Sequence, residues 1–349
     1  MMPMRLKYFI SIFLLFTGMF FAQQSEKTPI LKIDTVLARK MSVRAILVDK
    51  NKLWFAADQN VFGYYDYKKK KVTEKKLLLD NRTMEFRSIA QTKRYVFVAN
   101  VGSPACIFRI DKKTLDYSVV FQDNHKDAFL DSMVFMDNDT GIVVGDPTDN
   151  CLTILITNDG GKHWEKVPCE MLPKTEKGEA AFAASNSNVV VKGSKIWIVS
   201  GGVKSRVFYS ENGKDFVVND LPIVQGLSMT GAFTVDFYND RIGFVAGGDY
   251  EKPMLNKANK VLTTDGGMSW KTVADDMGFG YASCVQFVPK SDGRKIVAVG
   301  ASGVFYSSDS GTTWQKLSDD TTLYTIRFSD EHTFFAAGKD KIVKMEISE

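Results

Sequence analysis

The sequence predicts an all-β protein, a seven-bladed β-propeller built from four-stranded antiparallel blades. Two repeats support this prediction. The first is the pattern Ser/Thr-x-Asp-x-Gly-x-x-Trp, called the Asp-box below, with full copies at 157–164, 263–270 and 307–314 and a shortened copy at 210–216. The second is an apolar run that ends in a small residue or a turn former, and it occurs seven times. Repeats at such spacing are typical of an array of one supersecondary unit.

The first residues predict an exported protein. Arg5 and Lys7 precede the apolar run 8–21, and a small residue, Ala22, then leads into a polar segment. This order is typical of a secretory signal peptide, and the run is shorter than the ~20 residues that span a bilayer. We therefore expect a signal peptide over 1–22 and a mature chain, 23–349, that is periplasmic or extracellular and has no membrane span.

The net charge of the chain is too weak to indicate nucleic acid or an anionic membrane as its main partner. The formal net charge is +4, and loss of Arg5 and Lys7 with the signal peptide lowers it to about +2. We therefore expect neither nucleic acid nor an anionic membrane as the principal partner. The densest basic cluster, 68–71 with Lys75 and Lys76, is interpreted as a solvated hairpin turn.

Each blade is expected to contain an inner strand, a buried strand, a third strand, a turn that is often an Asp-box, and an outer strand. Alternating apolar residues mark inner strands at 43–48, 86–89, 133–135, 233–237 and 324–328. The continuous apolar runs are expected to be strands buried on both faces. These runs are 53–58, 95–100, 141–146, 196–201, 242–247, 296–300 and 333–338.

The two ends of the chain predict how the ring closes. The last unit, 321–347, is one strand short, whereas 30–37 form a spare strand before the first complete unit. We expect this N-terminal strand to complete the last blade, which would leave no open sheet edge. The result is one ring and a single domain over 23–349.

The Asp-boxes are interpreted as structural turns. Their hydroxyl and carboxylate groups can bond to backbone groups, the glycine permits positive φ, and the tryptophan packs back under the hairpin. The same side chains recur in outer turns, far from any shared pocket, so we assign them neither catalysis nor calcium binding. The segment 137–141 resembles part of a calcium loop but lacks the distal glutamate, and we expect a turn there.

Two of the four cysteines are expected to form a disulfide. If the first Asp-box hairpin pairs Thr157 with His163, the same register places Cys151 opposite Cys169. The register could differ by one residue. Cys106 and Cys284 are expected to be small buried hydrophobic residues.

The full Asp-boxes resemble the BNR or Asp-box repeats of sialidases, sortilin-type receptors and the photosystem II stability/assembly factor family. The segments 127–133, 145–149, 178–185 and 247–250 are similar to an exported bacterial family related to that assembly factor, whose members often carry the label oxidoreductase. The resemblance covers nearly the whole mature chain and implies repeats of the WD40/YVTN-like kind. The sequence has no GxGxxG after a strand, no CxxC and no haem motif, so no cofactor is expected.

Candidate binding residues are polar side chains expected where loops meet at the mouth of the central channel. They lie in or before inner strands, or directly after buried strands. The candidates are Arg44, Arg87, Asp127, Asp131, Asp146, Asp149, Glu179, Asp249, Tyr250 and Tyr281. Arginine can grip a carboxylate bidentately, which suits ligand binding, whereas salt bridges between blades and turn caps are the alternative role.

We expect a monomeric binding or assembly factor without enzymatic activity, which recognises a protein segment or a glycan. The alternative is a glycosidase of sialidase type, which needs three arginines, a Tyr–Glu pair and an acidic Asp. Arg44 and Arg87 supply two arginines, and no motif places the other groups, so no catalytic residue is assigned. A metal or redox enzyme is disfavoured because the chain has three histidines, His125, His163 and His332, and no metal site is expected.

Overall fold

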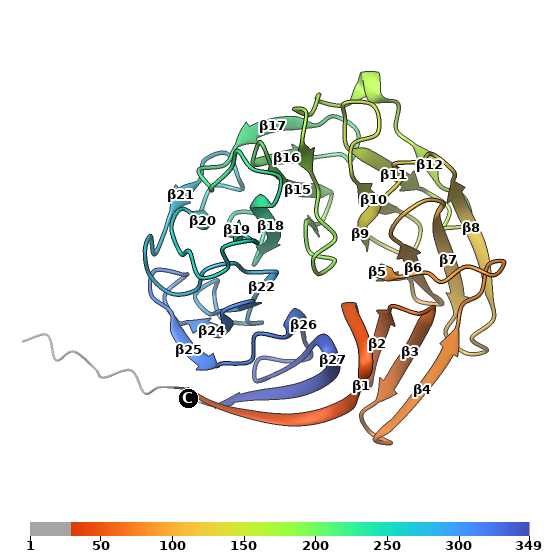
Figure 1. Ribbon diagram of the computed structural model, residues 1–349, viewed down its shortest axis with the longest axis horizontal. Helices are drawn as coiled ribbons and strands as arrows, with labels where there is room; N and C mark the ends of the chain where they lie inside the picture. Colours follow the sequence, from red (N-terminus) through yellow and green to blue (C-terminus); the bar gives the residue numbers. More distant parts are fainter. Residues whose placement is uncertain (1–28, 349) are drawn as a thin grey trace, which may run out of the picture.

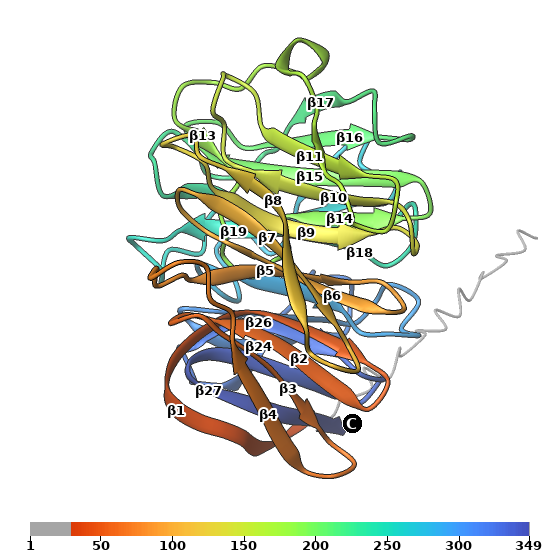
Figure 2. The same ribbon diagram turned by 90° about the vertical axis from the view of Figure 1, so that its right-hand side faces the viewer.

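The protein is a β-propeller of small antiparallel sheets arranged around one axis (Figure 1). The structure, a computed structural model, describes residues 29–348, so the predicted signal peptide lies outside the described residues. Seen from the side, neighbouring sheets lie face against face (Figure 2). One short 3-10 helix, η1 (Cys169–Met171), accompanies the strands in this range. None of the helices in the described part of the chain is long and apolar enough to cross a membrane.

Three of the sheets have four strands each, and hydrogen bonding follows the sequence order within each of them. The first contains β5 (Phe86–Gln91), β6 (Tyr95–Asn100), β7 (Ala105–Asp111) and β8 (Tyr117–Asp123). The second contains β9 (Leu130–Phe135), β10 (Gly141–Gly145), β11 (Thr153–Thr157) and β12 (Glu165–Lys166). The third contains β22 (Cys284–Phe287), β23 (Ile296–Gly300), β24 (Gly303–Ser307) and β25 (Gln315–Ser318).

A six-stranded sheet joins the two ends of the described chain. Its strands are β1 (Ile30–Asp49), β2 (Lys52–Ala57), β3 (Val61–Asp66), β4 (Lys71–Lys76), β26 (Leu323–Phe328) and β27 (Thr333–Ser348). The first part of β1 pairs with β27, and its last part pairs with β2. The long strand β27 turns back on itself, because the Ile347 N–H donates to the His332 carbonyl at 2.8 Å. Figure 1 shows β1 lying beside both β27 and β2.

A nine-stranded sheet contains the middle of the chain. Its path runs through β15 (Lys195–Gly202), β16 (Arg206–Ser210), β17 (Val217–Asp220), β18 (Thr230–Phe237), β19 (Gly243–Asp249), β20 (Lys260–Thr263) and β21 (Lys271–Thr272). Two further strands, β13 (Glu179–Ala180) and β14 (Val189–Lys192), both pair with β15. A single residue pair, Gly201 with Gly231, joins β15 to β18.

The sheets differ from the prediction of seven separate four-stranded blades. Hydrogen bonding groups the described strands into five sheets. There are two physical reasons. β1 continues without a break from one partner strand to another, and the Gly201–Gly231 pair is close enough to bridge two groups of strands that pack face to face.

The core lies between neighbouring sheets. All seven apolar runs of the sequence lie in strands whose side chains are largely buried. Contacts between sheets are aromatic in several places. Trp197 of β15 stacks on Phe237 of β18 with ring centroids 3.9 Å apart, and Phe97 of β6 contacts Phe135 of β9 at 4.8 Å. Burial of both sheet faces explains why these runs are continuous rather than alternating.

The Asp-box turns are held by their own side chains. The Thr157 hydroxyl donates to Asp159 at 2.9 Å and accepts the Gly161 N–H at 3.0 Å. Equivalent bonds surround Asp265 and Asp309, and Asn212 takes the same place in the shortened copy. The Ser269 hydroxyl is the first of the donors that lower the pKa of Asp265 to about 2. These carboxylates are therefore engaged in hydrogen bonds within their own turns.

A disulfide joins Cys151 to Cys169, with the sulfurs 2.15 Å apart and the Cα atoms 5.8 Å apart. The predicted register was wrong by one residue, because Ile156 pairs with Glu165. The ladder ends at Lys166, and Cys169 lies in η1 rather than in a strand. Cys106 and Cys284 are buried free thiols.

Candidate binding site

Five strands carry the same irregularity near the start of their pairing with the following strand. In β1, β5, β9, β18 and β26, one residue has no partner in the following strand. Each of these irregularities is a one-residue β-bulge. The skipped residues are Arg44, Arg87, Asp131, Phe233 and Tyr324. A bulge leaves one residue unpaired and redirects its side chain. The repeat therefore presents five side chains at the same level of the propeller.

Four of these side chains line a cavity of about 600 Å³, called the mouth cavity below. Eight of the ten predicted site residues also line it: Arg44, Arg87, Asp127, Asp131, Asp146, Glu179, Tyr250 and Tyr281. The other two lie elsewhere. Asp249 caps a turn by accepting the N–H groups of Glu251 and Lys252, and Asp149 lies 3.6 Å from Lys166 at the surface.

A loop between β13 and β14, residues 182–187, forms part of the wall of the mouth cavity. We call it the plug. Its residues 182–184 line the mouth cavity, whereas 186 and 187 line a second cavity of about 300 Å³. The plug takes the place of the bulge found in those five strands, since Ala180 still pairs with β15 before it and Val189 pairs with β15 after it. This loop was not among the elements predicted from the sequence.

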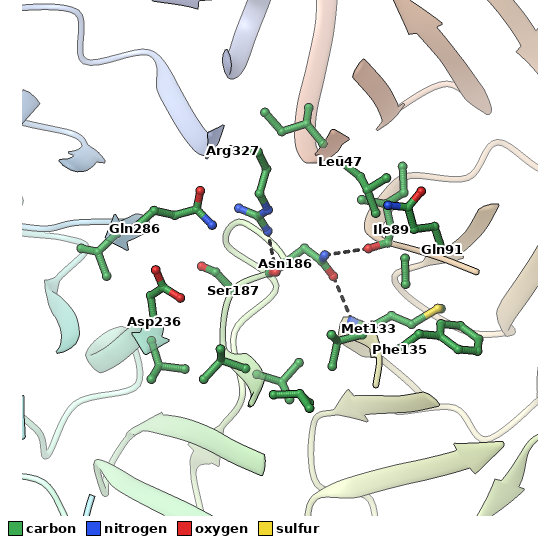
Figure 3. Close-up of a pocket in the computed structure, with 18 residues that line it drawn as sticks. Leu47, Ile89, Gln91, Met133, Phe135, Asn186, Ser187, Asp236, Gln286 and Arg327 are labelled. Carbon is green, nitrogen blue, oxygen red and sulfur yellow. Dashed lines mark hydrogen bonds between the residues drawn. The ribbon is translucent and has the colours of Figure 1, made fainter. Parts of the chain in front are cut away.

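The plug is fixed by hydrogen bonds to strands from distant parts of the chain. Asn186 donates to the Ile89 carbonyl at 2.8 Å and accepts the Met133 N–H at 2.9 Å. Arg327 donates to the Asn186 carbonyl at 2.8 Å. Figure 3 shows Asn186 among these three partners. Further bonds join Ser187 to Thr234 and Ser185 to the Ser283 carbonyl. The plug is thus bonded to β5, β9, β18 and β26.

The two arginines of the cavity differ in their contacts. Arg44 donates to the Ala184 carbonyl of the plug at 3.2 Å, and its guanidinium lies 4.0 Å from the centre of the Tyr324 ring. Its buried Nε has no hydrogen-bond partner among the described residues. The Arg87 Nε donates to Glu85 at 2.8 Å. Arg44 therefore supports the plug, whereas Arg87 is held only by a neighbouring side chain two residues away.

Two carboxyl groups of the cavity share a buried environment. Asp131 is fully buried, and neither of its oxygens has a hydrogen-bond partner among residues 29–348. Burial is the main cause that raises the pKa of Asp131 well above its usual range, and the nearby charge of Asp146 raises it further. The positive charge of Arg87 acts in the opposite direction and lowers this pKa. Asp146 accepts the Ala181 N–H at 2.8 Å, and burial raises its pKa as well. Both shifts have the same main cause, because burial disfavours the charged form of a carboxyl group.

Glu179 has a structural role within the cavity wall. It lies in β13, is 4% exposed, and accepts hydrogen bonds from the Ser200 hydroxyl and from the Arg206 guanidinium, whose Nε lies 3.0 Å from Oε1. Both residues lie in strands that pair with β15, so this ion pair joins parts of one sheet, unlike the predicted alternative of salt bridges between blades. A carboxylate with these partners is not free to act on a ligand or to activate Tyr281.

Another part of the cavity wall is a row of aromatic rings. Phe182 of the plug stacks on Phe233 with centroids 4.1 Å apart, and the edge of Tyr281 contacts Phe233 at 4.8 Å. Tyr250 continues the row at 5.2 Å from Tyr281 and is 46% exposed. Phe182 has a φ of 58°, which a non-glycine residue rarely adopts. Only Tyr250 and Tyr281 of this row were predicted.

Exposed apolar residues surround the outer end of this row. Leu227, Met254 and Leu255 are 58%, 71% and 46% exposed. Backbone hydrogen bonds join their loops to the cavity. The Tyr250 N–H donates to the Met229 carbonyl, and the Tyr281 N–H donates to the Pro253 carbonyl. In the described chain no group of three or more His, Cys, Asp or Glu side chains could hold a metal ion.

Comparison with solved structures finds the same fold at low sequence identity. YCF48 bound to a D1 peptide aligns with a TM-score of 0.64 and 14% identity over 91% of this chain and 97% of that chain. YCF48 from Cyanidioschyzon merolae aligns with a TM-score of 0.64 and 15% identity over 90% and 98%. A GH74 xyloglucanase from Xanthomonas campestris aligns with a TM-score of 0.67 and 13% identity, over 89% of this chain and 53% of that chain.

No protein-family model and no curated protein matches the sequence. The predicted resemblance to the photosystem II assembly factor is confirmed at the level of the fold. Both YCF48 structures are covered almost completely, whereas the chain spans about half of the xyloglucanase.

Proposed function

We propose that the protein binds an extended segment of another protein in the mouth cavity. The observation that carries this proposal is the composition of the cavity. Two arginines line one part, a row of four aromatic rings lines another, and exposed apolar side chains border the row. Arginine and tyrosine are enriched among the residues that dominate binding energy at protein interfaces.

The cavity favours a segment with two kinds of side chain. An acidic side chain would bind the guanidinium groups of Arg87 and Arg44, because a guanidinium matches a carboxylate in geometry and charge. An apolar or aromatic side chain would pack on the exposed ring of Tyr250. Exposed apolar patches of this kind mark interaction surfaces, and a glycan gains little from Leu227, Met254 and Leu255. This comparison favours a protein segment over a glycan.

No observation favours a hydrolase of sialidase type. The mouth cavity is lined by two arginines rather than three, and the Glu179 carboxylate is bonded to Arg206 and Ser200. The solved YCF48 structure that carries a D1 peptide is a protein of the same fold with a bound protein segment. This likeness agrees with the proposal without identifying the partner of this chain.

We infer further that the five sheets form seven blades in a closed ring. The supporting observation is a cycle of contacts among the first strands of the units, in the order β1, β5, β9, β14, β18, β22 and β26, with β26 contacting β1. The pairing of β1 with β27 would then close the ring. Export is also a proposal, and the Cys151–Cys169 disulfide supports it because such bonds persist in oxidising compartments.

The test is selection of peptides from a random library displayed on phage, using the mature protein, 23–349. Tyr250→Ala and Arg87→Gln change side chains that are accessible at the cavity, and Met171→Ala, at an exposed residue of η1, is the matched control. Selected peptides should bind each cavity variant at least about fivefold more weakly, since truncating an interface anchor costs more than ~1 kcal/mol.

Two outcomes would overturn the proposal. Selected peptides could bind the wild type and both cavity variants equally, which would place the binding surface elsewhere. Alternatively, a neutral oligosaccharide from a parallel glycan array could bind the wild type and lose affinity in the same two variants. That result would assign the cavity to a glycan instead.

A further inference from the structure

Four turns at the end of the propeller opposite the mouth cavity form a strongly basic surface. β1 runs from Arg44 at the mouth to Asp49 at this end, and the turn to β2 follows there. The turns between β3 and β4, β5 and β6, and β7 and β8 lie at the same end, because Lys52 pairs with Asp66 and Tyr95 pairs with Asp111. Their cationic residues are Lys50, Lys52, Lys68, Lys69, Lys70, Lys71, Lys93, Arg94, Lys112 and Lys113.

This concentration of charge is local. The four turns hold ten of the 45 lysines and arginines but only four of the 41 acidic residues, Asp49, Asp66, Asp111 and Asp116. The remainder of the sequence therefore has 35 cationic and 37 acidic side chains. Turns at the corresponding place in three other groups of strands are Asp-boxes, so the fold does not require lysines there.

The acidic residues of these turns are already engaged. Asp66 accepts the N–H groups of Lys68 and Lys69, and Asp111 accepts the Lys113 N–H and bonds to Arg94. Asp49 forms an ion pair with Lys112 at 2.8 Å. In the part of the chain that the structure describes, no ion pair forms at the exposed amino groups of Lys50, Lys93 and Lys113. Their charges are thus free to attract an anion.

A cavity of about 640 Å³ lies within this surface, between the two neighbouring groups of strands. Lys50, Lys93 and Lys113 line it together with Trp54. Trp54 is fully buried, and its indole N–H has no hydrogen-bond partner among residues 29–348. The Lys112–Asp49 ion pair and the bond from Lys75 to the Leu115 carbonyl hold the two groups of turns together. The cationic turns therefore form a continuous surface around a defined cavity.

We propose that this basic surface binds an anionic polysaccharide with carboxylate, sulfate or phosphate groups repeated along its chain. Lysine ammonium groups spread over four turns match a polymer of repeated charges better than one small anion. A membrane surface is the weaker candidate, because the exposed large hydrophobic residues of the described chain all lie outside these four turns. Membrane-bound surfaces usually combine cations with inserted apolar side chains. The proposal is independent of the mouth cavity.

The test compares two triple variants of the mature protein that lose the same charge. The first is Lys50→Gln with Lys93→Gln and Lys113→Gln, in the basic surface. The control is Lys162→Gln with Lys214→Gln and Lys271→Gln, at exposed lysines of other turns and strands. The probes are polygalacturonate, heparin and a phosphate-bearing teichoic acid, with neutral dextran, vesicles containing phosphatidylglycerol and duplex DNA for comparison.

The wild type should bind at least one anionic polysaccharide, in a manner that weakens with salt, and should not bind dextran. The basic-surface variant should bind at least tenfold more weakly, whereas the control should change less than twofold. Equal loss in both triple variants would overturn the proposal, as would the absence of binding to all three polysaccharides. Tighter binding to the vesicles or to DNA would also overturn it and would assign the surface to that partner.

Discussion

Replacing Asn186 by alanine tests whether the plug is a rigid part of the propeller. Asn186 bonds through its side chain to the Ile89 carbonyl at 2.8 Å and to the Met133 N–H at 2.9 Å, and all of these groups are buried. The residue has a φ of 55°, in the left-handed region that asparagine tolerates better than alanine. Asn186→Ala therefore removes two hydrogen bonds and adds backbone strain.

The expected loss of stability follows from these contacts. A buried polar group left without a partner costs about 1–3 kcal/mol, and two such groups remain after the substitution. Alanine in the left-handed conformation adds about 1 kcal/mol. The free energy of unfolding should therefore fall by about 3–7 kcal/mol. At roughly 2 °C per kcal/mol for a chain of this size, the Tm should fall by about 6–14 °C.

The assay is thermal unfolding of residues 23–349, followed by calorimetry and by circular dichroism. Asn186→Gly is the matched variant, because it removes the same hydrogen bonds but adopts positive φ without strain. It should melt above Asn186→Ala and below the wild type. If Asn186→Ala melted together with the wild type, water would have to replace both bonds, and the reasoning that the plug is pinned by Asn186 would be refuted.

Three further predictions concern buried or shifted ionisable groups. Glu179→Gln should lower the free energy of unfolding in urea by about 3–5 kcal/mol, because Arg206 would remain buried without its counter-ion, whereas the exposed Glu165→Gln should be near neutral. Burial lowers the pKa of Lys260 from 10.5 to about 8 in the folded protein. Between pH 8 and 10.5 the unfolded state therefore binds more protons than the folded state. The stability of the wild type relative to Lys260→Met should therefore rise across that window, and a flat difference would contradict the burial of the charge. The Asp-box turn lowers the pKa of Asp265 from 3.8 to about 2, so its contribution is present above pH 3.8 and disappears as the pH falls towards 2. Asp265→Asn should lack this acid-dependent loss of stability. Acid unfolding curves of identical shape for the wild type and Asp265→Asn would contradict the prediction.

The strands could be predicted because their signals are local. Apolar runs such as 95–100 and 296–300 must be buried wherever they lie, and the turn chemistry of the Asp-boxes depends on residues four apart or fewer. The grouping into sheets could not be predicted in the same way. It depends on whether β1 bends or breaks between its two partners, and on one close approach between Gly201 and Gly231.

Much of the candidate site was also predictable, because residues at the same place in successive repeats come together in a propeller. That rule brought Arg44, Arg87 and Asp131 to one cavity. It could not assign roles within the cavity. Glu179 was a candidate for binding, yet its partner Arg206 follows 27 residues later and makes it structural. Asp249 satisfies backbone groups of its own turn instead of lining the cavity.

The sequence by itself determined the fold class, the strands and the end of the propeller at which most of the candidate residues lie. These properties follow from periodicity and local turn chemistry, which a single segment contains. Only the tertiary structure decided the bulges, the plug and the basic surface. Asn186 and Ile89 are 97 residues apart in the chain, and the lysines of the basic surface come from four separate turns. Such contacts arise from the packing of distant segments, and no local pattern encodes which of them meet.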